Sequence, residues 1–132
     1  MTDTLERPEV LTEVRVDLHG YHPDEITGWP LLQIVEQAWE IGANRLRLIH
    51  GHGRNRPTAI RGARFNTGFL GLRIRNDLEK PSPEVRRYIK RVDCALPGST
   101  AIWLRPNPEP SRDDLDLSVL PRPADSRFLK GW

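Results

Sequence analysis

The chain has 132 residues, which suits one domain with short ends, and its one cysteine excludes an internal disulfide framework and a cysteine-based zinc site. Its net charge of +2 conceals an asymmetry, because residues 45–91 hold 13 basic and 3 acidic side chains, and 11 of the basic ones are arginines. A middle third this basic suits a polyanionic partner, with a solvated arginine-rich surface as the alternative. The lack of a long apolar run or a signal peptide favours a soluble, cytoplasmic protein with no membrane partner.

The first half of the chain predicts a βαβ unit. Residues 1–12 alternate acidic and small polar side chains, which is typical of a flexible leader. Residues 14–18 alternate apolar and polar side chains and predict a strand. His22 is expected to cap a short helix, and apolar residues at helical spacing predict a longer helix over 31–41. A second strand over 45–50 completes the unit, so the two strands are expected to be parallel neighbours.

The second half of the chain is less regular. Residues 69–80 fit both helix and strand spacing, and their length favours a helix. Residues 83–92 predict a short helix that enters a strand, and residues 100–105 predict a further strand. Residues 107–132 are rich in proline and acid and predict a disordered tail, so a chain ending after residue 107 is expected to melt within a few degrees of the full chain. The apolar residues near the end of this tail would dock on the domain or on a partner: Phe128, Leu129 and Trp132.

All four histidines fall in two clusters, each at the end of a predicted strand. Asp17 and His19 lie at the end of the first strand, and His50 and His52 lie at the end of the second. Because the carboxyl ends of parallel strands meet at one edge of a sheet, these side chains are expected to converge there. A histidine exchanges protons near neutral pH, and a carboxylate can orient it. A single histidine at such a position more often caps loop carbonyls, so the prediction depends on the joint placement.

The loop after the second cluster has the composition of a phosphate-binding loop. Its glycines allow the backbone to approach a phosphate closely, and its arginines supply positive charge. A Gly-x-Gly sequence is also common in ordinary tight turns. The candidate phosphate-binding residues are Gly51, His52, Gly53, Arg54, Arg56, Arg61 and Arg64.

The stretch Val16-Asp-Leu-His-Gly20, followed by a helix and then Leu48-Ile-His-Gly-His-Gly53, resembles the Smr (small MutS-related) domain family over residues 13–106. The resemblance implies an α/β fold, a two-layer sandwich with a mixed sheet of about four strands and two main helices, like the C-terminal domain of a translation initiation factor. It also implies nucleic-acid binding, with endonuclease activity in several members. His52 departs from the pattern, because lysine or arginine is common there. The family's motif residues correspond here to Asp17, His19, His50, Gly51 and Gly53.

Together these features predict an endonuclease that cuts phosphodiester bonds in structured or branched DNA or RNA, with Asp17, His19 and His50 as catalytic residues. The alternative is a non-catalytic module that binds nucleic acid or a ribosome through the same basic loop. No residue is assigned as a metal ligand, and a divalent cation such as Mg²⁺ or Mn²⁺ stays open as a cofactor. The tail over 107–132 is a candidate contact for a protein or ribosome partner.

Overall fold

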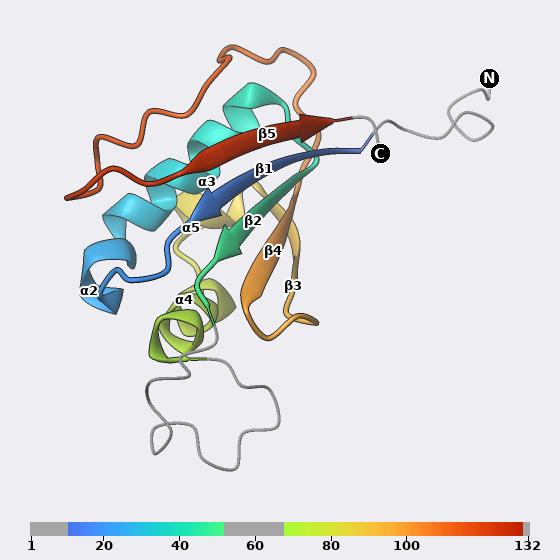
Figure 1. Ribbon diagram of the computed structural model, residues 1–132. Helices are drawn as coiled ribbons and strands as arrows, with labels where there is room; N and C mark the ends of the chain where they lie inside the picture. The colour runs from blue at the N-terminus through green and yellow to red at the C-terminus, as the bar shows by residue number, and fades with distance from the viewer. Residues whose placement is uncertain (1–10, 52–67, 131–132) are drawn as a thin grey trace.

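A mixed five-stranded sheet with the strand order β3-β4-β2-β1-β5 organises the fold, with helices packed on one face (Figure 1). The computed structural model describes residues 11–51 and 68–130. The strands are β1 (Thr12–Asp17), β2 (Arg45–Ile49), β3 (Ile89–Asp93), β4 (Ser99–Leu104) and β5 (Ser126–Lys130). The helices in these residues are α2 (Pro23–Ile26), α3 (Trp29–Ile41), α4 (Phe69–Glu79) and α5 (Pro83–Arg86).

The predicted βαβ unit is confirmed, because β1 and β2 are parallel and are joined through α2 and α3. Pro30 lies in the first turn of α3, where its missing N–H costs no intrahelical hydrogen bond, so the helix begins at Trp29. The helix ends at Gly42, whose φ of +89° is favourable for glycine. The buried stripe of α3 contains Leu31, Ile34, Val35, Ala38 and Ile41.

The second half of the chain confirms three further predictions. Residues 69–79 are helical, and Leu70, Ile74 and Leu78 are buried at helical spacing. Helix α5 leads into β3, and β4 lies between β3 and β2 as an antiparallel strand. The α/β class and the mixed sheet are therefore confirmed, and α3 and α4 are the two longer helices. Within residues 11–51 and 68–130 the sheet has five strands, whereas about four were expected.

Alternation along the strands separates two faces of the sheet. Val14, Val16, Leu46 and Leu48 are buried on the inner face, where they join the apolar residues of the helices in one core. We call the opposite face, which carries charged side chains, the outer face. Asp17 follows the buried Val16, so it belongs to the outer face.

The predicted disordered tail is wrong for residues 107–130. Strand β5 lies beside β1 (Figure 1) and pairs with it in antiparallel register, with Phe128 opposite Val14. The segment before β5 is held on α3, because the buried Gln37 accepts from the N–H of Asp116 and donates to its carbonyl. Leu120 is buried in the core. The residues that make these contacts are about 80 to 120 positions apart in sequence, so local periodicity contains no signal for them.

We expect a chain ending after Asn107 to melt more than about 10 °C below the full chain. Truncation exposes one edge of β1 and removes Leu120 from the core, and each lost kcal/mol lowers the Tm of a small domain by roughly 4–8 °C. Thermal unfolding followed by circular dichroism measures the difference. A Leu120→Ala variant of the full chain should lose about 2–5 kcal/mol. A truncated chain that melts within a few degrees of the full one would contradict the structural role of β5.

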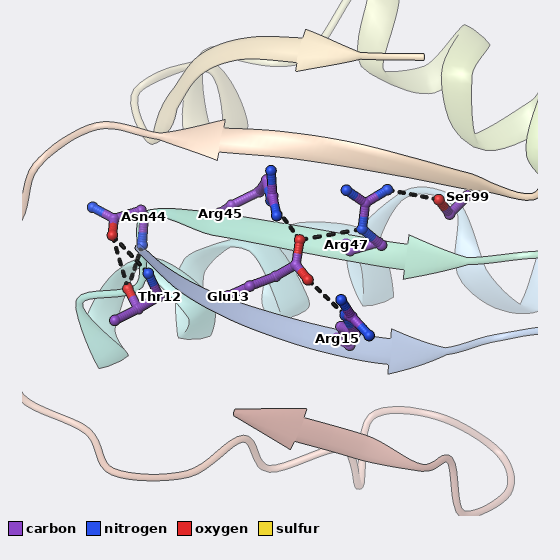
Figure 2. A network of polar contacts seen from close by, with 7 residues as sticks. All are labelled: Thr12, Glu13, Arg15, Asn44, Arg45, Arg47 and Ser99. Carbon is purple, nitrogen blue, oxygen red and sulfur yellow. Dashed lines mark hydrogen bonds and ion pairs between the residues drawn. The ribbon is translucent and has the colours of Figure 1, made fainter. Parts of the chain in front are cut away.

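A charged cluster on the outer face joins β1 to β2 (Figure 2). Glu13 is fully buried, and its carboxylate accepts from Arg15 at 2.6 Å, from Arg47 at 3.1 Å and from Arg45. Burial raises the pKa of Glu13, but the Arg15 hydrogen bond and the charges of Arg47 and Arg45 outweigh it, so the pKa lies below its usual 4.5. We call these four residues the Glu13 cluster. Arg47 also donates to Ser99 at 2.8 Å and so connects the cluster to β4.

Candidate active site

Asp17 and His19 form a contact at the carboxyl end of β1. The Nδ1 atom of His19 lies 2.5 Å from Oδ1 of Asp17, and the backbone N–H of His19 donates to the same oxygen at 3.1 Å. The carboxylate therefore fixes Nδ1 as the protonated nitrogen and leaves Nε2 as the proton acceptor of the neutral ring. The side chain of His19 is 70% exposed, so a substrate in solution can reach it.

The two predicted motifs meet at this edge of the sheet. A Cβ placed on Gly51 would lie 3.6 Å from Cβ of His19, and the N–H of Leu18 donates to the carbonyl of Ile49 at 2.7 Å. Gly51 has a φ of +82°, a conformation that favours glycine. Its backbone N–H donates to the carbonyl of Gly98 at 3.0 Å, so this amide is already used within the fold.

The structure places His50 differently from Asp17 and His19. It follows Ile49, keeps the inward direction of Leu48 and is 5% exposed. Its Nδ1 donates to the carbonyl of Gly51 at 3.1 Å, and its Nε2 accepts from the hydroxyl of Thr100 at 2.9 Å. Both ring nitrogens are thus engaged, and His50 links the end of β2 to β4 from inside the domain.

Arg75 completes this inner network and was not a sequence candidate. From α4 it donates to the Thr100 hydroxyl at 2.8 Å and to the carbonyls of Leu96 and Ser99 at 2.7 and 2.9 Å. The chain of donors runs from Arg75 through Thr100 to His50 and holds the β3–β4 turn against the site. The sequence feature that could have indicated Arg75 is its position next to the buried Ile74, at the edge of the apolar stripe of α4.

The segment before β5 holds the loop that carries His19. The guanidinium of Arg122 donates to both carboxylate oxygens of Glu25, at 3.1 and 3.2 Å, and lies 4.3 Å from the ring centroid of Tyr21. The Tyr21 hydroxyl donates to the carbonyls of Arg122 and Pro123. The hydrogen bond from Arg122 and that from the backbone of His22 hold the pKa of Glu25 below its usual range. The Asp17 N–H also donates to the carbonyl of Asp125 at 2.9 Å.

The remaining sequence candidates divide into two groups. His22 caps α2 as predicted, with Nδ1 accepting from the N–H of Asp24 and Glu25 completing a capping box. The remaining six candidates for phosphate binding lie in residues 52–67, outside the described residues, so their role stays a prediction. They are His52, Gly53, Arg54, Arg56, Arg61 and Arg64.

The described residues hold no group of three or more histidine, cysteine, aspartate or glutamate side chains placed to bind a metal ion. None of the helices in residues 11–51 and 68–130 has the length and apolar character needed to span a membrane.

Comparisons with family models, curated proteins and solved structures found no match to the chain.

Proposed function

We propose that this protein is a cytoplasmic nucleic-acid-binding protein of the Smr type that cleaves phosphodiester bonds, with a fold like the C-terminal domain of a translation initiation factor. The observation that carries the proposal is the Asp17–His19 contact beside Gly51, at the carboxyl edge of two parallel strands. It pairs an exposed imidazole with a carboxylate that sets its tautomer, which is the arrangement of a general base and its orienting group.

In the proposed step His19 acts as the base. Its Nε2 takes the proton of an attacking water or sugar hydroxyl, and the oxygen of that group forms a bond to phosphorus. The bond from phosphorus to the leaving oxygen breaks, and the leaving oxygen takes a proton from solvent. Asp17 accepts the hydrogen bond from Nδ1–H and stabilises the imidazolium that forms. The proposed step assigns no residue as a metal ligand, and the cleavage experiment below compares Mg²⁺, Mn²⁺ and chelator.

A non-catalytic binding module is the second candidate, and the placement of His50 favours it. The sequence prediction names His50 beside Asp17 and His19 as a catalytic residue, whereas His50 is buried with both ring nitrogens hydrogen-bonded. A module that binds nucleic acid or a ribosomal surface needs basic side chains, and it does not require a second exposed histidine.

The test is incubation of the purified full chain with labelled branched DNA, duplex DNA and RNA, each with Mg²⁺, with Mn²⁺ and with chelator. Cleavage by the wild type and its loss in a His19→Ala variant that still binds would support the endonuclease. Tight binding without cleavage of any substrate would favour the module. Absence of both binding and cleavage would refute the proposed function.

A further inference from the structure

The outer face of the sheet carries two cross-strand rows rich in arginine. In the first row Arg127, Arg15 and Arg47 stand directly opposite one another on β5, β1 and β2, and the row continues through Ala101 to Asp93. The second row crosses all five strands and contains Leu129, Glu13, Arg45, Trp103 and Arg91. Five arginines therefore share this face with the carboxylates of Glu13 and Asp93.

The arginines of the outer face differ in how closely they contact carboxylates of the fold. Like charges placed directly opposite one another destabilise a sheet, so a row of three arginines has an energetic cost. Glu13 contacts Arg15 and Arg47 of that row, and it is fully covered. Arg127 is exposed beside Arg15. A row of this kind indicates a surface whose positive charge is matched by a polyanion.

Aromatic and planar groups lie among the charges. The guanidinium carbons of Arg45 and Arg91 each lie 4.9 Å from the ring centroid of Trp103. Guanidinium planes can stack on bases while they pair with phosphates. An open sheet face accommodates an extended single strand in this way, whereas reading a duplex requires an element that enters a groove.

The arginine rows also lead to the candidate active site. Arg15 and Asp17 lie at alternate positions on the outer side of β1, about 6.6 Å apart along the strand, and Asp17 contacts His19 in the turn that follows the strand. A strand of nucleic acid bound on the rows would therefore reach the exposed imidazole of His19.

We infer that the outer face binds single-stranded nucleic acid through the exposed arginines of these rows, above all Arg91 and Arg127, and delivers it to His19. This inference rests on the proposed function and deepens it by naming the form of the substrate and the surface that holds it. RNA and DNA share the phosphodiester chemistry, and the two arms of the experiment distinguish them.

The experiment measures binding by the full chain of fluorescein-labelled oligouridylate and oligothymidylate, by anisotropy over a series of salt concentrations. The test variant is Arg91→Gln/Arg127→Gln, which leaves the Glu13 cluster intact. The control is Arg86→Gln/Arg87→Gln, which makes the same charge change at exposed residues of α5 and its C-cap. Circular dichroism melts confirm that both variants are folded.

We expect the test variant to bind about tenfold more weakly for each arginine replaced, and its log–log salt slope to fall by about 1.4, since each single-strand phosphate contact contributes roughly 0.7. The control should match the wild type, and Arg91→Lys/Arg127→Lys should keep the wild-type slope. A test variant with unchanged affinity and slope would overturn the inference and leave the cleavage proposal standing. Wild-type protein that binds duplexes and neither single strand would overturn it in the same way.

Discussion

A His19→Ala variant should cleave roughly 10²–10⁴-fold more slowly than the wild type while its affinity for nucleic acid changes little. The size of the loss is that of a positioned general base, and the exposed ring of His19 has no role in the core. An Asp17→Asn variant should also cleave slowly, because an amide can donate to Nδ1 and so favour the wrong tautomer of the ring. Single-turnover cleavage rates and equilibrium binding measured on the same preparations separate the two effects.

Two other histidines supply the controls for this prediction. His22→Ala removes an exposed cap from α2 and should leave the cleavage rate unchanged. His50→Ala should lower the free energy of unfolding by about 1–3 kcal/mol, because it removes the partner of the Thr100 hydroxyl. A folded His19→Ala variant that cleaves at the wild-type rate would remove His19 from the mechanism.

A Glu13→Ala variant should lose about 3–5 kcal/mol of unfolding free energy, a large part of the 5–15 kcal/mol typical of a domain. Removing the buried carboxylate leaves Arg15, Arg45 and Arg47 beside one another without their shared anion. Urea unfolding gives the free energy, and Glu79→Ala, at an exposed residue of α4, is the control with an expected change within about 0.5 kcal/mol. A loss below about 1 kcal/mol in Glu13→Ala would show that the cluster contributes little to stability.

The Glu13 cluster should also make the free energy of unfolding depend on pH. The pKa of Glu13 in the folded chain lies below its usual 4.5, so its contribution is fully present above pH 4.5 and is lost as the pH falls through the folded pKa. Glu13→Gln keeps the size of the side chain and removes this titration. The difference in unfolding free energy between the wild type and Glu13→Gln should therefore shrink as the pH is lowered from 7 to below 4. A difference that stays constant over this range would contradict the charged role of Glu13.

Local patterns determined much of this fold from the sequence alone. The apolar stripe of α3, the alternation of β1 and the cap at His22 depend on residues a few positions apart, so their spacing predicts them. The Asp17–His19 contact belongs to the same class, because the two residues are separated by one position. The meeting of the two motifs follows from the parallel pairing of β1 and β2, which a βαβ unit imposes.

Tertiary structure decided the features that join distant segments. Strand β5 pairs with β1 across more than a hundred residues, and Gln37 and Leu120 hold the segment before it, so no local period predicts this pairing. His50 became an interior link because Thr100, fifty residues away, offers a hydroxyl on the inner side of β4. Glu13 is buried because strand pairing brings Arg45 and Arg47 beside it. In each case the stabilising contact is with a residue that is distant in sequence and comes close only when the chain folds.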